Sequence, residues 1–147
     1  MDLVEIEPTR YAVKSGSCGH HEIGQLLGQL FNEVAQGVGD TPVGVPVAIY
    51  TAWNETTCDI LAGFSVPDGT TVEGLITFDM EGLTAAHTTH NGPYQNMMAT
   101  WNQLWADFSA AGMQAGGPPW EEYVVGMQET SDPSQLVTDI YIPLAKL

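Results

Sequence analysis

Positive charge is nearly absent from this sequence. Three lysine and arginine residues stand against 18 aspartate and glutamate residues, so the formal net charge is -15. A phosphate backbone and an anionic membrane surface both repel such a chain, which argues against direct binding to nucleic acid or to membranes. The charge by itself does not identify a ligand, because surface carboxylates ordinarily serve solubility. It does raise the local concentration of cations near any cleft.

Cysteine and long apolar runs are scarce as well. Cys18 and Cys58 are the only cysteines, and because their spacing matches no metal-binding pattern we expect two thiols, with one disulfide as the alternative. The four histidines fit no common zinc spacing. No N-terminal segment resembles a signal peptide, and no apolar run is long enough to span a bilayer. The sequence therefore predicts a cytoplasmic protein that holds neither a metal nor a cofactor.

The apolar pattern predicts one domain over residues 1–147, made of short strands and two main helices. Alternating segments predict strands at 3–6, 11–15, 45–53, 59–66, 72–80, 83–89 and 120–125. Two longer segments have apolar residues at the i, i+3, i+4, i+7 spacing of a helical face. The first helix begins at Ile23 and ends near Gly37 and Gly39. The apolar face of the second carries Tyr94, Met97, Met98, Trp101, Leu104, Trp105 and Phe108.

The sequence also repeats itself. Residues recur at a constant separation of 73 positions in the pairs Gly19/Gly92, Gly39/Gly112, Gly44/Gly117, Pro46/Pro119 and Tyr50/Tyr123. Further along, Asp59-Ile60 matches Asp139-Ile140 at a separation of 80, which places an insertion between Gly126 and Val137. We therefore predict an α+β fold of two β-α-β-β halves, about 1–70 and 71–147. We expect the halves to be related by a pseudo-twofold axis and to share one antiparallel sheet of about eight strands.

Two adjacent acids lie in Trp120-Glu121-Glu122-Tyr123, which we expect to be a strand. Successive strand residues point to opposite faces, so Glu121 shares a face with Tyr123, and Glu122 shares a face with Trp120. One acid should face solvent, and the other should face an apolar interior where a carboxylate without a partner is costly. In the repeat, Ala48 matches Glu121, so the scaffold is duplicated and the acid is not. A buried acid without a partner in the chain favours a cationic ligand.

Three stretches carry a family resemblance: Gly92-Pro93-Tyr94 with the helix that follows to Gly112, Trp120-Glu121-Glu122-Tyr123, and Thr138-Asp139-Ile140-Tyr141-Ile142-Pro143-Leu144. Together they resemble the GyrI-like small-molecule-binding domain, which is also the effector-binding domain of AraC-type and multidrug-sensing bacterial regulators. Each stretch alone is weak, but their order, their spacing and the internal duplication make the match specific over nearly the whole chain. In that family the acid two residues before the tyrosine lies at the floor of an aromatic pocket and meets cationic drugs. Here the matching acid is Glu121.

The resemblance implies a pocket between the two halves for small cationic molecules with an aromatic or amphipathic body. The ligand-binding residues that we expect, with no catalytic residue among them, are Glu121, Tyr123, Tyr50, Trp101, Trp105, Tyr94 and Tyr141. Aromatic faces would stack on a flat ligand and add cation–π attraction of roughly 0.5–2 kcal/mol each. For Trp101, packing in the core is an equal alternative.

Many members of the family are fused to a DNA-binding helix-turn-helix, and no such segment is recognisable in this sequence. We therefore expect a module that senses or sequesters its ligand, and whose control of transcription needs a separate DNA-binding regulator as partner. Two alternatives stay open. Some relatives resemble hydrolases of electrophilic molecules, for which Glu121 would act as general base and Tyr123 as proton donor. In the second alternative, the groove between the two halves is a docking site for a partner protein.

Overall fold

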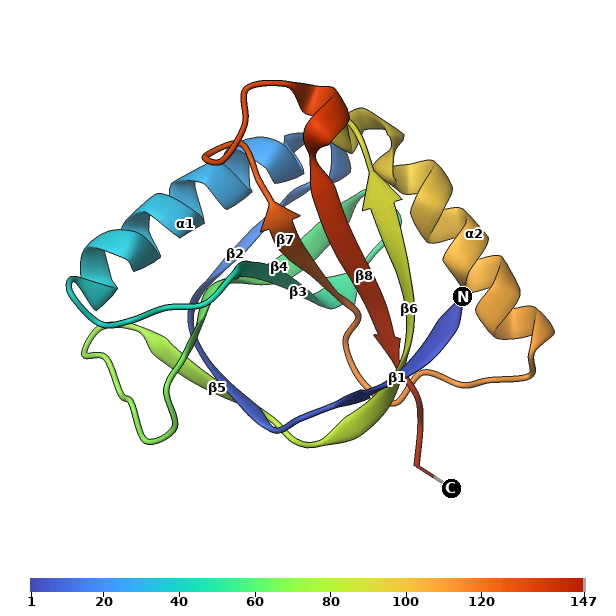
Figure 1. The fold of residues 1–147 in the computed structure, drawn as a ribbon, viewed down its shortest axis with the longest axis horizontal. Coiled ribbons are helices and arrows are strands. Elements are labelled where there is room, and N and C mark those ends of the chain that lie inside the picture. Colours follow the sequence, from blue (N-terminus) through green and yellow to red (C-terminus); the bar gives the residue numbers. More distant parts are fainter. Residues whose placement is uncertain (147) are drawn as a thin grey trace. The chain divides into compact units, whose positions relative to one another are not determined.

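The computed structural model describes residues 1–146, and the chain forms two compact units whose elements are labelled in Figure 1. Unit 1 consists of Met1–Ile6 and of the chain from Leu83 onward, and unit 2 consists of Glu7–Gly82. Each unit has four antiparallel strands and one main helix. None of the helices in the described residues is both long enough and apolar enough to cross a membrane.

Unit 2 has the strand order β3-β4-β2-β5. Its elements are β2 (Thr9–Gly19), the short helix η1 (His20–Glu22), α1 (Ile23–Val38), β3 (Pro46–Trp53), β4 (Thr57–Val66) and β5 (Ile76–Met80). Helix α1 packs through an apolar stripe, since its Val34 and Val38 form a buried cluster with Ala12 and Val66 of the sheet.

Unit 1 has the strand order β1-β6-β8-β7. Its elements are β1 (Asp2–Ile6), β6 (Leu83–Asn91), the short helix η2 (Tyr94–Asn96), α2 (Met97–Ala110), β7 (Trp120–Val125), the short helix η3 (Pro133–Gln135) and β8 (Val137–Pro143). Helix α2 covers one face of this sheet: its Leu104 and Phe108 form a buried cluster with Ile140 and Ile142 of β8. That face holds the candidate site.

The leading strands of the two sequence repeats are exchanged between the units. Strand β1 comes first in the chain and pairs with β6, whereas β5 comes first in the second repeat and pairs with β2. The boundaries of the two compact units therefore differ from the boundaries of the two sequence repeats. The physical reason is that strand pairing joins segments far apart in the chain, which local sequence patterns do not encode.

The predicted α+β class with two main helices and a duplicated β-α-β-β plan is confirmed. At the separation of 73 positions, α1 matches α2 and β3 matches β7, and at the separation of 80, β4 matches β8. The paired glycines Gly39 and Gly112 both follow a helix with positive φ, 55° and 73°, a conformation that glycine adopts without steric cost. The predicted strand at 72–80 begins only at Ile76, and the strand at 11–15 is longer, Thr9–Gly19.

Candidate functional site

The two acids of β7 lie on opposite faces of the unit 1 sheet, as the alternation predicts. Glu121 is paired with Ile140 of β8 in the strand register, and Glu122 is paired with Asp139. Because Ile140 packs in the cluster with α2, the face that carries Glu121 is the face covered by the helix. The register also puts Tyr123 on the Glu121 face, opposite Thr138.

Glu121 is buried, with 4% of its surface exposed, and its carboxylate is held by two aromatic donors. The indole Nε1–H of Trp101 on α2 donates to Oε2 at 2.7 Å, and the hydroxyl of Tyr123 donates to Oε1 at 2.5 Å. The expectation of a buried acid without a partner in the chain is therefore wrong. Aromatic side chains with a polar tip reach the carboxylate and satisfy it. Both donors are neutral, so they bind the oxygens and leave the negative charge in place.

Tyr94 lies at the exposed edge of this group. Its ring meets that of Tyr123 edge-on, with centroids 5.9 Å apart, and 38% of its surface is exposed. Burial of the rest of the ring raises the pKa of Tyr94, and the nearby carboxylates of Glu121 and Glu129 raise it further. Glu129 is held in the loop after β7, where its Oε2 accepts a hydrogen bond from the amide of Gly126 at 2.8 Å. The charge of Glu121 thus acts on a side chain that solvent reaches.

The structure brings four of the seven predicted site residues together: Glu121, Tyr123, Trp101 and Tyr94. Trp105 of α2 is 37% exposed and meets Phe108 edge-on at 5.6 Å. Tyr50 belongs to unit 2, where it is buried and its ring lies 5.8 Å from that of Trp53.

Tyr141 lies on the opposite face of the unit 1 sheet, with Glu122. Its ring stacks on Trp120 with centroids 4.7 Å apart, and its hydroxyl donates to Glu122 at 3.4 Å. The indole of Trp120 donates to the other oxygen of Glu122 at 3.3 Å. Burial is the main cause that raises the pKa of Glu122, and Asp139, its partner in the register, adds to it. The second acid is therefore half-buried among aromatic rings.

Sequence reasoning missed two residues beside these acids. His87 of β6 binds Asp139 through Nε2 at 2.9 Å on the Glu122 face. On the Glu121 face Thr138 is fully buried, and its hydroxyl has no hydrogen-bond partner. The sequence did indicate that Thr138 faces the interior. Thr138 stands two positions before Ile140, so in a strand both side chains point to the same face. In the repeat, Thr138 matches Cys58.

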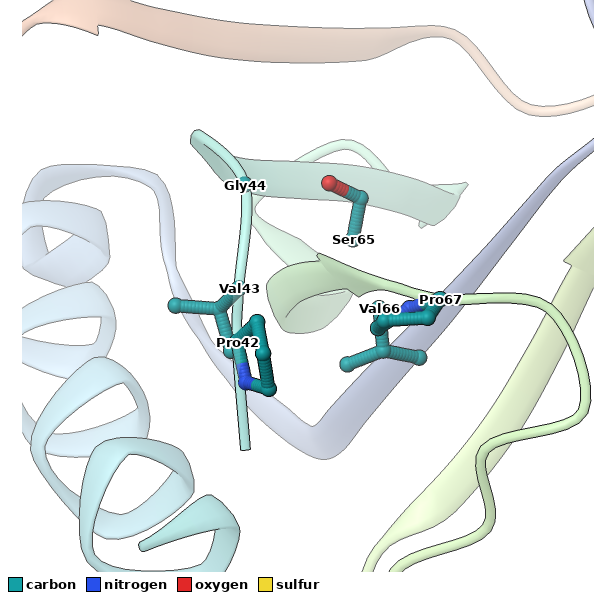
Figure 2. A pocket seen from close by; sticks show the side chains of 6 residues that line it. All are labelled: Pro42, Val43, Gly44, Ser65, Val66 and Pro67. Atoms are coloured by element: carbon teal, nitrogen blue, oxygen red, sulfur yellow. The ribbon is translucent and has the colours of Figure 1, made fainter. Parts of the chain in front are cut away.

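A shallow pocket of about 210 Å³ lies in unit 2 (Figure 2). It is lined by Pro42, Val43, Gly44, Ser65, Val66 and Pro67. The amide of Gly44 donates to the carbonyl of Ser65 at 2.9 Å, which fixes the two walls to each other. None of the predicted site residues lines this pocket, and it offers a ligand no charged side chain.

The comparisons with known proteins give one family match and several similar folds. The model of the GyrI-like small molecule binding domain matches residues 1–145, whereas no curated protein matches the chain in sequence. The fold is similar to that of EcmrR in an EcmrR–DNA complex, with a TM-score of 0.82 and 21% identity over 99% of this chain and 57% of EcmrR. For the EcmrR C-terminal domain the TM-score is 0.76 and the identity 18%, over 99% of this chain and 97% of the domain. This chain thus spans little more than half the length of EcmrR.

Two other structures extend the range of similar folds. SAV2435 bound to tetraphenylphosphonium has a TM-score of 0.71 and 8% identity over 97% of this chain and 92% of SAV2435. A hydrolase encoded by lin2189 from Listeria innocua has a TM-score of 0.63 and 11% identity, over 97% of this chain and 90% of the hydrolase. At these identities the similarity shows a shared fold.

Proposed function

This chain belongs to the family of GyrI-like small molecule binding domains, and we propose that it binds small organic cations with an aromatic or amphipathic body at Glu121. One observation carries the proposal: a buried carboxylate lies among aromatic side chains and is hydrogen-bonded by the neutral donors Trp101 and Tyr123. A carboxylate in such surroundings attracts a cation more strongly than one in water, because the effective dielectric constant is lower.

Aromatic rings around Glu121 supply the second part of the attraction. Trp101 and Tyr123 donate hydrogen bonds to the carboxylate, and Tyr94 meets the ring of Tyr123 edge-on. A delocalised or quaternary cation next to such rings gains cation–π attraction of roughly 0.5–2 kcal/mol for each ring. The flat body of the ligand is then held by stacking, while Glu121 holds its charge.

The indole of Trp101 already donates a hydrogen bond to one of the two carboxylate oxygens of Glu121. Its Nε1–H lies 2.7 Å from Oε2 of Glu121. A cation that takes this oxygen must displace the indole, or else share the carboxylate from the side of Tyr94. Tyr94 is the more exposed of these neighbours, so we propose that the ligand approaches past Tyr94.

Binding serves the sensing or sequestration of the ligand. SAV2435 has a similar fold and binds the lipophilic cation tetraphenylphosphonium. EcmrR has a similar fold and is found in a complex with DNA, and this chain matches little more than half of EcmrR. Any control of transcription by this domain would therefore act through a DNA-binding partner.

The test is a titration of the purified protein with tetraphenylphosphonium and, as a neutral ligand of similar shape, triphenylphosphine oxide. Glu121→Gln should weaken binding of the cation by a factor of about 30 or more, as expected when a buried charge loses its partner. The matched control Glu122→Gln changes the adjacent acid on the other face and should leave the affinity unchanged. Equal affinity for the neutral ligand, or a loss confined to Glu122→Gln, would contradict the proposal.

Hydrolysis is the second candidate function. The Tyr123 hydroxyl donates to Glu121, which is the arrangement of a general base next to a proton donor, and the similar fold from Listeria innocua is that of a hydrolase. Incubation of the protein with a strained electrophile, such as an aryl-substituted cyclopropyl ketone, followed by mass spectrometry separates the two functions. A hydrated product that forms catalytically with the wild type and not with Glu121→Gln would favour the hydrolase; an unchanged compound favours binding alone.

A further inference from the structure

The hydroxyl oxygen of Thr138 is buried in unit 1 without a hydrogen-bond partner. Its side chain is 0% exposed, and the Oγ1 atom forms no hydrogen bond in the structure. A buried hydroxyl without a partner loses its interactions with water and gains nothing in return. Valine has nearly the same shape without this penalty, so the hydroxyl needs a reason beyond packing.

The strand register places Thr138 in the candidate site. It lies opposite Tyr123 of β7 on one side and opposite His90 of β6 on the other, on the face that α2 covers. Directly opposite side chains on antiparallel strands have Cβ atoms about 4.5–5.5 Å apart, and diagonal neighbours about 7–8 Å. Glu121 is such a diagonal neighbour of Thr138, because it is paired with Ile140.

The groups that flank Thr138 already have hydrogen bonds of their own. The Tyr123 hydroxyl donates to Glu121. The ring nitrogens of His90 lie 2.6 Å from Oγ1 of Thr100 and 2.9 Å from the carbonyl oxygen of Pro93. The hydroxyl of Thr138 is thus left over on the same face as the buried carboxylate.

We propose that Thr138 is a second polar contact of the ligand, and that it selects organic cations carrying an N–H or O–H group several ångströms from the centre of positive charge. The charge is held by Glu121, and the ligand's N–H or O–H group donates to Oγ1 of Thr138. This inference rests on the proposed cation site at Glu121 and adds the class of cation that the site prefers.

Two triarylmethyl dyes provide the probe. Pararosaniline carries free amino groups, whereas crystal violet has the same cationic framework with every amino group fully methylated, so that it has no N–H donor. Thr138→Val should weaken the binding of pararosaniline by about fivefold to tenfold, the effect of one lost hydrogen bond, and leave crystal violet unchanged. Thr138→Ser keeps the hydroxyl and should retain the affinity for pararosaniline.

Each outcome bears on one proposal. If both dyes bind the wild type, lose affinity in Glu121→Gln and keep it in Thr138→Val, the role of Thr138 is wrong and the cation site stands. An equal loss of both dyes in Thr138→Val would mean that Thr138 shapes the site, and would also overturn the inference. If neither dye binds the wild type, the cation site itself fails. A thermal melt of Thr138→Val controls for folding, and its midpoint should equal or exceed that of the wild type.

The two cysteines carry a second, independent inference. Cys18 of β2 and Cys58 of β4 are directly paired in the antiparallel register, and neither is in a disulfide. Paired residues of antiparallel strands have Cα atoms about 4.5–5.5 Å apart, within the range that a disulfide spans. We infer that Cys18 and Cys58 form a redox-sensitive disulfide that ties β2 to β4.

Oxidised glutathione is a suitable oxidant, and the exposure of the cysteines gives the order of steps. Cys18 is partly exposed and Cys58 is buried. The Cys18 thiolate attacks the glutathione disulfide and releases one glutathione thiolate. The Cys58 thiolate then attacks the Cys18 sulfur of the mixed disulfide and releases the second glutathione. Two protein thiols are oxidised, one glutathione disulfide is reduced, and the two protons of the protein thiols pass to the two released glutathione thiolates.

Intact-mass measurement after incubation with oxidised glutathione tests this step. The wild type should lose two hydrogen atoms and both titratable thiols, whereas Cys58→Ser should keep one glutathione on Cys18. Dithiothreitol should reverse both changes. A wild type that retains both thiols, or that ends as a stable glutathione adduct, would overturn the inference.

Discussion

The two units share one plan and differ in what lies between sheet and helix. In unit 1 the contact between α2 and the sheet includes Glu121 and Tyr123 of β7 and Trp101 of α2, and the matching positions of unit 2 at the separation of 73 hold Ala48, Tyr50 and Gly28. Tyrosine is thus retained in both units, whereas the acid and the indole that donates to it occur only in unit 1.

This difference separates the scaffold from the site. In unit 2 the matching positions 48 and 28 hold alanine and glycine, and neither of these carries a charged side chain. In unit 1 a carboxylate can be buried at the same place because Trp101 and Tyr123 satisfy its oxygens. Both units keep a fully buried residue on the opposite face of the strand, Trp120 in unit 1 and Val47 in unit 2.

The largest expected effect is a loss of stability on substitution of Trp120, which lies on the face of β7 opposite to Glu121. Trp120→Ala should lower the free energy of unfolding by about 3–5 kcal/mol, because the substitution leaves a large cavity beside Tyr141. The matched change Val47→Ala in unit 2 should cost only about 2 kcal/mol, since fewer buried methyl groups are lost. Urea unfolding measures both values. Equal losses would show that Trp120 is not a larger part of the core than its counterpart.

Trp101→Phe tests whether the indole competes with the ligand for Glu121. The substitution keeps an aromatic face and removes a hydrogen bond to a carboxylate, whose contribution is about 1.5–3 kcal/mol in a ligand-free protein. We expect tetraphenylphosphonium to bind severalfold more tightly, while the protein unfolds at lower urea concentration. Weaker binding would contradict this competition and would mean that the cation–π attraction of the indole outweighs its hydrogen bond to Glu121. Leu104→Met, also on α2, controls for changes in the packing of the helix.

Glu122 makes the stability of the fold depend on pH. Burial raises its pKa in the folded protein above the ordinary value of 4.5, so the folded state holds this proton more tightly than the unfolded state. Its contribution is present below the ordinary pKa and is lost as pH rises through the raised pKa. Glu122→Gln should therefore unfold at higher urea concentration than the wild type at neutral pH, and the difference should vanish in acid. The exposed Glu55→Gln is the control, and an equal gain there would contradict this reason.

Tyr94 reports the charge of Glu121, and this effect is the smallest. Because burial, Glu121 and Glu129 raise the pKa of Tyr94 in that order, Glu121→Gln should lower the pKa toward its ordinary value of 10.0. Glu129→Gln should lower it less. The absorbance of tyrosinate followed during an alkaline titration measures the change, and Tyr94→Phe assigns the signal. No difference between Glu121→Gln and the wild type would mean that the carboxylate does not act on Tyr94.

Much of the site was within reach of the sequence. Alternation along β7 alone separates Glu121 from Glu122, because side chains of a strand have a period of two. The aromatic face of α2 follows from its helical period, and Trp101 lies on it. Tyr141 shows the limit: its place on the Glu122 face depends on its register with Trp120, and register is a property of the pair of strands.

The sequence by itself determined the local elements, the duplicated β-α-β-β plan and the two faces of β7, because each follows from short-range periodicity or from self-similarity. Only the tertiary structure decided which strands pair and which side chains meet. The exchange of β1 and β5, the indole of Trp101 at Glu121, the buried hydroxyl of Thr138 and the opposition of Cys18 and Cys58 all arise from contacts between segments far apart in the chain. Such contacts are set by long-range packing and register, which no local pattern contains.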